Sequence, residues 1–282
     1  MKQRILTGIF GSAFMILVFT LHNTIVLNIV LMLVCVIATF ECLKSTRYVR
    51  NQAIFISSLV YSLLPAYFPL FDFKIGLIVT ILYIGTLFAI ALKFNETIKL
   101  AELSFAFTMT LVINLSLMLL GVFGRIGDIY PQTYQNVDAV FMLLVTFGGA
   151  WFCDIGAYFV GSFYGKHKLA PVISPKKTIE GAVGGVVTNI ILLILLGFIW
   201  KLFMFTTSES IQWIPLIILA IITSFVGMFG DLVFSMIKRK CNIKDYGNLI
   251  KGHGGVLDRF DSVITVTPVV FLFIQFFHLL ER

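Results

Sequence analysis

Four aspartates of this sequence stand inside or beside long apolar runs. Asp154 and Asp231 interrupt such runs, whereas Asp258 and Asp261 lie three residues apart at the beginning of the last one. A lone ionised carboxylate at the centre of a membrane costs roughly 2.5–3.5 kcal/mol by insertion measurements, so a cation or a donor must compensate it. A salt bridge to a neighbouring helix would do so, but four carboxylates near one depth favour a bound metal ion.

Magnesium is the metal that fits these oxygen ligands. It prefers oxygen donors, keeps several waters, and is usually held by one or two carboxylates plus substrate phosphates. Zinc favours nitrogen and sulfur ligands, and the four cysteines show no paired metal spacing, so we expect free, packed thiols. The pattern indicates metal-dependent chemistry on phosphates, such as phosphoryl or nucleotidyl transfer.

Basic residues, glycines and a histidine are interleaved with the aspartates in two segments, residues 151–181 and 230–261. The excess of Lys and Arg in cytoplasmic loops explains part of this set. It does not explain why Gly252, Gly254 and Gly255 flank His253. A glycine-rich turn that leads into a helix lets backbone N–H groups approach a phosphate closely. We therefore expect an anion and metal site here.

Long apolar segments must position these residues. The chain has 282 residues, of which 59% are hydrophobic and 12% charged, and its mean hydropathy is +1.00. Soluble domains have about 25% charged residues. A membrane helix needs about 20 apolar residues, and the short alternating segments of a membrane barrel are absent. We predict an all-α integral membrane protein with about nine transmembrane helices: Ile5–Leu21, Thr24–Phe40, Ala53–Leu70, Phe73–Leu92, Leu103–Phe123, Val137–Tyr164, Glu180–Phe203, Ile211–Ser235 and Phe260–Leu280.

The first apolar run resembles a signal peptide because Lys2 and Arg4 precede it. No small-x-small cleavage site follows, however, and a second apolar stretch comes next, so we interpret it as an uncleaved span. With nine spans, 17 of the 21 Lys and Arg residues fall on the side of the N-terminus, which predicts that this side is cytoplasmic. We expect one integral domain, with five spans in residues 1–135 and a catalytic region in residues 136–282.

The segment from Ser235 to Asp261 resembles the signature of the phosphatidate cytidylyltransferases, also called CDP-diglyceride synthases. It reads Ser235-x-x-Lys-Arg-x4-Lys-Asp-x-Gly-x4-Gly-His-Gly-Gly-x-x-Asp-Arg-x-Asp261. A second block is similar in order and spacing, with Asp154-x-x-Ala-Tyr158, Gly165-Lys-His-Lys-Leu169 and Ser174-Pro-Lys-Lys-Thr-x-Glu-Gly181. The likeness covers the chain from about residue 148 onward, and the N-terminal spans match only in hydropathy. Lys251 replaces the proline that the family usually has, which leaves the rigidity of the turn open.

The resemblance implies the reaction of CTP with phosphatidic acid to give CDP-diacylglycerol and pyrophosphate, with Mg²⁺ required. It implies that Asp231 and Asp258 bind the metal, with Asp154 and Asp261 in or beside its shell. Catalytic roles fall to Asp231, Asp258, Lys238 and His253, the last in positioning a phosphate. The residues expected to bind substrate are Ser174, Lys166, Lys176, Lys177, Arg239, Lys244, Asp245, Gly254, Gly255 and Arg259.

The expected partners are CTP, phosphatidic acid and the lipid bilayer, with no nucleic acid, and a homodimer is left open. We expect a bacterial cell membrane, because the chain is short and carries no soluble extension, and an active site that faces the cytoplasm. Two other readings remain. A CTP-dependent transferase could act on an archaeal ether-lipid phosphate or a polyprenol, because no residue pattern in the sequence indicates the chemistry of the lipid chains. An ion-coupled transporter also carries intramembrane carboxylates, but there they would recur in two halves.

Overall fold

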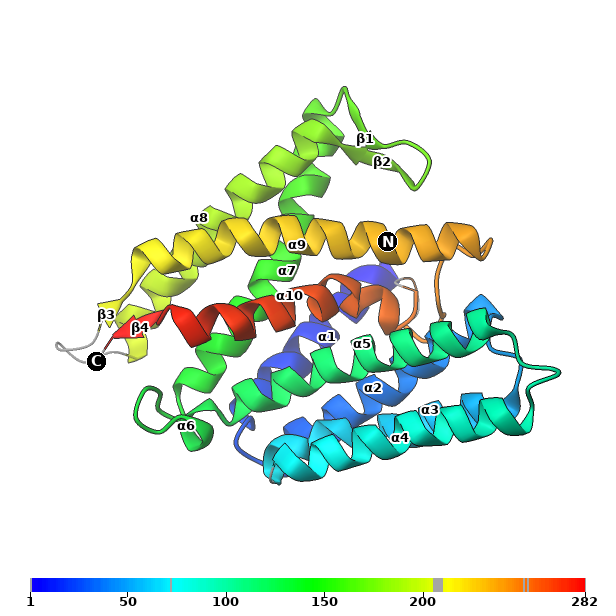
Figure 1. Ribbon diagram of the computed structural model, residues 1–282. Coiled ribbons are helices and arrows are strands. Elements are labelled where there is room, and N and C mark those ends of the chain that lie inside the picture. The colour runs from blue at the N-terminus through cyan, green and yellow to red at the C-terminus, as the bar shows by residue number, and fades with distance from the viewer. Residues whose placement is uncertain (1, 72, 205–209, 251, 253, 282) are drawn as a thin grey trace.

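The computed structural model describes residues 2–71, 73–204, 210–250, 252 and 254–281. Helices make up most of this part of the chain (Figure 1). Their bounds are α1 Lys2–Thr20, α2 Ile25–Thr46, α3 Gln52–Ser62, α4 Phe73–Lys93, α5 Leu100–Gly124, α6 Ile126–Ile129, α7 Asp138–Tyr164, α8 Ile179–Met204, α9 Trp213–Lys240 and α10 Leu257–Phe276. A short 3₁₀ helix, η1, covers Pro65–Leu70.

Seven of the described helices are long and apolar enough to cross a membrane. They are α2, α3 together with η1, α4, α5, α7, α8 and α9. This bears out the predicted class of an all-α, multi-pass membrane protein. Helices α1 and α10 lie where the first and ninth spans were expected, but the count of nine and the side of the N-terminus stay predictions.

The third predicted span, Ala53–Leu70, is not one continuous α-helix. Helix α3 ends at Ser62, and the chain continues as η1 from Pro65. Proline disfavours the α conformation of the residue before it and has no N–H to donate, so Pro65 breaks the helix. Pro65 was the signal in the sequence that could have shown that the helix ends before it.

Two antiparallel strand pairs add small pieces of sheet. Strand β1 (Lys168–Ala170) pairs with β2 (Ser174–Thr178), so a segment expected to be a loop is a hairpin. Strand β3 (Ser210–Ile211) pairs with β4 (Leu280–Glu281). The ninth predicted span was therefore too long at its end, because α10 stops at Phe276. Helix α9 continues to Lys240, five residues beyond the predicted end of the eighth span.

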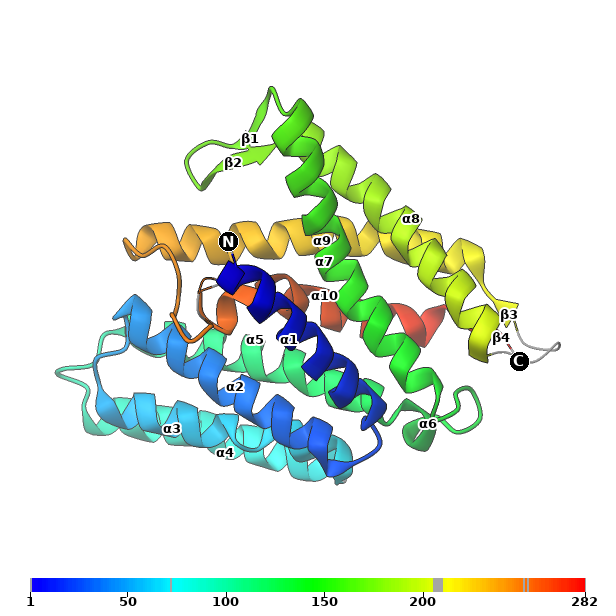
Figure 2. The ribbon, with the colours of Figure 1, turned by 180° about the vertical axis from the view of Figure 1, so that it is seen from behind.

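Helices α9, α10, α5 and α2 lie next to one another, with α3 and α4 on the far side of α2 and α5 (Figure 1). Helices α7 and α8 form a tightly packed pair that crosses the others at an angle and carries the β1–β2 hairpin at its end (Figure 2). Small residues allow this close packing, since a Cβ at Gly181 would lie 3.1 Å from the Cα of Gly161 and a Cβ at Gly156 would overlap Thr188. Such small-residue contacts are typical of helix pairs in membranes.

Buried amide side chains tie the helices together where lipid offers no hydrogen bonds. Asn189 of α8 donates to the carbonyl of Ala220 at 2.9 Å and to the Ser224 hydroxyl at 2.8 Å, both on α9. Asn114 of α5 donates to Thr39 of α2 and Ser62 of α3, each at 3.0 Å. These contacts join α8 to α9, one of the helices that carry the site residues, and α5 to α2 and α3.

Candidate active site

The last turns of α9 carry three polar side chains on one face. Asp231, Ser235 and Lys238 are spaced by four and three residues, which places them one above another on a helix. The Ser235 hydroxyl donates to Oδ1 of Asp231 at 3.2 Å. The sequence suggested a loop after Ser235, but the helix continues to Lys240, where basic side chains interact favourably with the helix C-terminus.

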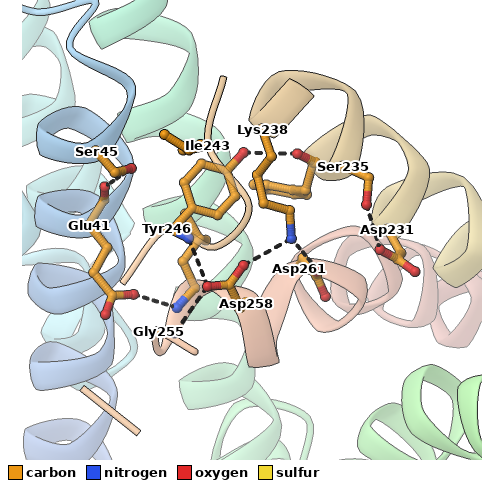
Figure 3. Close-up of polar contacts among 12 residues, drawn as sticks. Glu41, Ser45, Asp231, Ser235, Lys238, Ile243, Tyr246, Gly255, Asp258 and Asp261 are labelled. Atoms are coloured by element: carbon orange, nitrogen blue, oxygen red, sulfur yellow. Dashed lines mark hydrogen bonds and ion pairs between the residues drawn. The ribbon is translucent and has the colours of Figure 1, made fainter. Parts of the chain in front are cut away.

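The first turn of α10 carries Asp258, and the structure engages both oxygens of its carboxylate (Figure 3). Oδ1 accepts from Nζ of Lys238 at 2.9 Å. Oδ2 accepts from the backbone N–H groups of Tyr246 at 2.8 Å and Gly255 at 3.0 Å. Its side chain is 3% exposed. Asp258 therefore holds the loop between α9 and α10 against the start of α10.

Glycine is required in this loop where the backbone turns. Gly252 and Gly254 have φ values of 81° and 86°, in the left-handed region that side chains disfavour. A Cβ at Gly254 would also lie 3.1 Å from Oδ2 of Asp258. His253 and Lys251 lie outside the described residues, so the expected role of His253 stays a prediction.

Lys238 links two aspartates of α10. Its Nζ lies 2.9 Å from Oδ1 of Asp258 and 4.0 Å from Oδ2 of Asp261, and it stands 5.4 Å from the centre of the Tyr246 ring. A buried ammonium is stable only when it is paired and hydrogen-bonded. The two carboxylates and the ring supply that compensation.

Asp154, Asp231 and Asp261 bring carboxylates from α7, α9 and α10 into one electrostatic neighbourhood. Asp154 interacts with Asp231 and Lys177, and Asp261 interacts with Asp231 and Asp154. Lys177 of β2 forms an ion pair with Oδ2 of Asp231. The predicted carboxylates thus converge on one region together with two of the predicted lysines.

Within the described part of the chain, no three Asp, Glu, His or Cys side chains are grouped so that they could hold a metal ion by themselves. The oxygens of Asp258 are engaged by Lys238 and by backbone N–H groups. Asp154, Asp231 and Asp261 have unfavourable charge–charge interactions with one another, which a cation beside one or two of them would relieve. Since Mg²⁺ often takes one or two carboxylates plus substrate phosphates, this donor set fits a metal that binds together with substrate.

The β1–β2 hairpin is fastened at both ends and presents Lys177 to the site. At its base, Glu180 accepts from the backbone N–H groups of Lys166 and His167, each at 3.1 Å. Near its turn, Nε of Arg239 donates to the carbonyl of Ile173 at 3.3 Å. Successive side chains of a strand point to opposite faces, so Lys177 meets Asp231 while Lys176 is exposed.

The other residues predicted to bind substrate differ in how far they are exposed to solvent. Lys166, Arg239, Lys244, Asp245 and Arg259 are exposed. Ser174 is half-buried in β2, and Gly255 is buried beside Asp258. No described contact assigns these residues to a substrate, so their roles stay predictions.

Two residues of this region were missed by sequence reasoning. Tyr246 donates its backbone N–H to Asp258 and its hydroxyl to the carbonyl of Phe234 at 3.1 Å. Burial raises the pKa of the Tyr246 phenol well above its usual range, so it remains a proton donor. Glu41 was missed because the second span was predicted to end at Phe40, whereas α2 continues to Thr46. A carboxylate directly after an apolar run was the signal that could have found it.

An apolar cavity of about 660 Å³ adjoins the charged centre. Its walls come from α1, α2 and α7, with Gly11, Leu31 and Phe147 among them, and its lining includes Asp154 and Asp261. Phe14 of α1 also lines it and is 55% exposed, so the cavity reaches the outer surface of the helices. One continuous space therefore joins an apolar surface to the carboxylates.

Comparison with known proteins gives consistent matches over the whole chain. The profile described as "Cytidylyltransferase family" matches residues 2–277. A phosphatidate cytidylyltransferase of Bacillus subtilis is 33% identical over 281 residues, which cover 98% of each chain. Phosphatidate cytidylyltransferases of Staphylococcus haemolyticus and Haemophilus influenzae are each 42% identical over 145 and 146 residues, 51% of this chain and 53% and 49% of theirs. The match therefore extends to the N-terminal helices.

Proposed function

Since the chain belongs to the cytidylyltransferase family, we propose that it converts CTP and phosphatidic acid into CDP-diacylglycerol and pyrophosphate. The phosphatidate cytidylyltransferase of Bacillus subtilis aligns with 98% of the chain. The observation that carries the proposal is the cavity that joins an apolar wall to Asp154 and Asp261. It suits a substrate with acyl chains at one end and a phosphate at the other.

In this arrangement the acyl chains lie along α1 and α2, and the lipid phosphate lies beside the charged centre. Lys177 pairs with Asp231, and Nζ of Lys238 lies 4.0 Å from Oδ2 of Asp261, so both lysines supply positive charge for phosphates near the aspartates. Arg259 also lines the cavity. The chain's main contribution is then to position two phosphate groups and to neutralise their charge.

The reaction joins an oxygen of the lipid phosphate to the α-phosphorus of CTP. The bond from that phosphorus to the oxygen bridging to the β-phosphate breaks, and pyrophosphate leaves with that oxygen. A lipid phosphate is already ionised at pH 7, so the step needs little help from a general base. Lys177 and Lys238 hold and neutralise the phosphates, and the buried pairing with Asp258 orients Lys238.

Mg²⁺ is proposed to bind with substrate at Asp231, with Asp154 and Asp261 beside it. When bound, it neutralises charge on the transferred phosphate and on the leaving pyrophosphate. Asp258 belongs to the same centre, and its contacts in this structure suit a positioning role. Its direct binding of the metal stays a prediction.

The proposal includes the orientation of the chain in its membrane and the identity of that membrane. Nine spans with a cytoplasmic N-terminus place both motif segments on the side where CTP is available, and the uneven distribution of Lys and Arg supports this orientation. The relatives described above are bacterial, which supports a bacterial cell membrane. Formation of a homodimer stays open.

The test of this function uses the purified full chain in detergent with CTP, Mg²⁺ and dioleoyl phosphatidic acid. We expect pyrophosphate and CDP-lipid in equal amounts, and neither product without lipid or after removal of divalent ions with EDTA. Polyprenol and an ether-lipid phosphate serve as alternative acceptors. A CDP-lipid formed only from the ether-lipid phosphate, or polyprenyl phosphate and CDP formed only from polyprenol, would reassign the substrate. Counterflow in vesicles without turnover would indicate a transporter.

Substitution of Gly11 by leucine should narrow the acyl-chain part of the cavity. A Cβ at Gly11 meets nothing within 4 Å, and this residue lines the cavity. We expect the KM for phosphatidic acid to rise roughly 10-fold, since a few methylenes in an apolar pocket change binding by about 1–3 kcal/mol. The KM for CTP should not change.

Gly85→Leu is the matched control for this substitution. Gly85 lies on α4, does not line this cavity, and a Cβ there also meets nothing within 4 Å. Equal effects of the two substitutions on the KM for lipid would remove the cavity as the lipid site.

A further inference from the structure

A buried glutamate of the N-terminal half caps the helix that carries Asp258 and Asp261. Oε2 of Glu41, on α2, accepts from the backbone N–H of Leu257 at 2.9 Å. Glu41 is 6% exposed, and Figure 3 shows it facing the start of α10. The first N–H groups of a helix have no partner within it, and a negative charge there is stabilising.

The loop between α9 and α10 leaves room for this carboxylate at two glycines. A Cβ at Gly247 or at Gly255 would overlap the carboxylate of Glu41. Gly247 does not have the positive φ of Gly252 and Gly254. Gly247 therefore leaves space for the Glu41 carboxylate, although its backbone conformation does not require glycine.

Glu41 also stands on the helix that forms one wall of the apolar cavity. Leu27, Leu31 and Val34 of α2 line that cavity, and Glu41 follows Val34 by seven residues, two turns along the same face. The rigid helix thus joins the cavity wall to the first turn of α10. The Glu41 contact therefore links the helix of the apolar wall to the helix that carries the two aspartates.

We propose that Glu41 is a positioning residue, which fixes the Asp258–Asp261 turn at a set place relative to the lipid cavity. This inference rests on the proposed function, because it assigns Glu41 a role in the same site. Glu41 holds the loop and the helix start from the α2 side, while Asp258 holds the same loop from the α10 side through Tyr246 and Gly255. Without Glu41, the N–H of Leu257 loses its buried partner and the turn can shift.

The test combines Glu41→Ala, Glu41→Gln, Gly247→Ala and the double variant Glu41→Ala/Gly247→Ala. Turnover should fall on the order of 10²-fold in Glu41→Ala, because a displacement of about 1 Å at a reacting centre has effects of this size. Glu41→Gln keeps an acceptor oxygen and should stay within about 3-fold of wild type. Gly247→Ala should lower turnover in the wild type but by less than about 2-fold in the Glu41→Ala background, because the overlap is then gone.

Hydrogen–deuterium exchange of the backbone amides of residues 254–260 is a second measurement, which does not depend on enzymatic turnover. Exchange should be faster in Glu41→Ala and Gly247→Ala than in wild type and Glu41→Gln. Glu102→Ala is the matched control, since Glu102 is also 6% exposed and accepts two backbone N–H groups, those of Arg50 and Asn51 at 2.6 Å, at the start of α3. It should leave exchange in residues 254–260 unchanged.

Three results would overturn the positioning role: unchanged exchange in Glu41→Ala, a Glu41→Gln variant as inactive as Glu41→Ala, or independent effects of Glu41→Ala and Gly247→Ala. If the wild type makes no CDP-lipid, the proposed function fails. The exchange measurements then still decide whether Glu41 holds the start of α10.

Discussion

Lys238→Met is expected to abolish turnover and to lower the free energy of unfolding by about 3–5 kcal/mol, the cost of removing one partner from a buried ion pair. Lys238 is the cation that lies between Asp258 and Asp261, and the Asp258 side chain is 3% exposed. Methionine has a similar length, so packing is largely kept while the charge is lost. Thermal unfolding in detergent and pyrophosphate release measure the two effects.

Stability and activity can be separated with a second variant. In Lys238→Met/Asp258→Asn the uncompensated charge at position 258 is removed, and asparagine still offers an oxygen to the N–H groups of Tyr246 and Gly255. We expect this double variant to recover most of the stability but none of the turnover. Lys240→Met, at an exposed position of the same helix, should change stability by no more than about 0.5 kcal/mol. A stable and active Lys238→Met variant would contradict the role of this pair.

Asp231→Asn is expected to lower kcat by about 10²–10³-fold with little loss of stability. Losses of this order follow when one preorganised electrostatic group is removed from a reacting centre. The Asp231 side chain is 22% exposed and pairs with Lys177, while an asparagine would still accept from Ser235. The fold should therefore tolerate the change better than the change at Lys238.

Titration with Mg²⁺ tests whether Asp231 acts as a ligand of the metal ion. If Asp231 holds the ion together with substrate, any residual turnover of Asp231→Asn should require more Mg²⁺ for half-saturation than the wild type. Asp128→Asn is the control, because Asp128 is a carboxylate on α6 paired with Arg125 at 3.7 Å. Wild-type kcat and Mg²⁺ dependence in Asp231→Asn would assign the metal to other ligands.

The sequence predicted which charged residues meet better than it predicted how they pair. The sequence predicts Asp231 and Asp258 as metal ligands with Asp154 and Asp261 beside them. Asp154, Asp231 and Asp261 share one electrostatic neighbourhood, whereas both oxygens of Asp258 are engaged by Lys238 and backbone N–H groups. The pairing of Lys238 with Asp258 was not foreseen. The hydropathy pattern predicts that the eighth span ends at Ser235, because charged residues follow it. Helix α9 nevertheless continues through these charged residues to Lys240. That extra turn and a half points Lys238 at α10.

Contacts between distant parts of the chain were outside the reach of sequence patterns. Glu41 and Leu257 are 216 residues apart, and no local period indicates that one caps the other. The sequence predicts a loop where the β1–β2 hairpin lies, because its lysines and proline hide the alternation typical of strands. The helices themselves were found because about 20 consecutive apolar residues are a strong local signal.

Because the cavity reaches the outer surface at Phe14, the concentration of lipid substrate that this enzyme meets is its concentration within the membrane. A lipid that binds through it stays in the bilayer before and after the reaction, while the nucleotide and pyrophosphate exchange with water. The rate then depends on the mole fraction of the lipid among its neighbours in the membrane. Adding inert phospholipid at constant total phosphatidic acid therefore dilutes the substrate, although its amount per volume is unchanged.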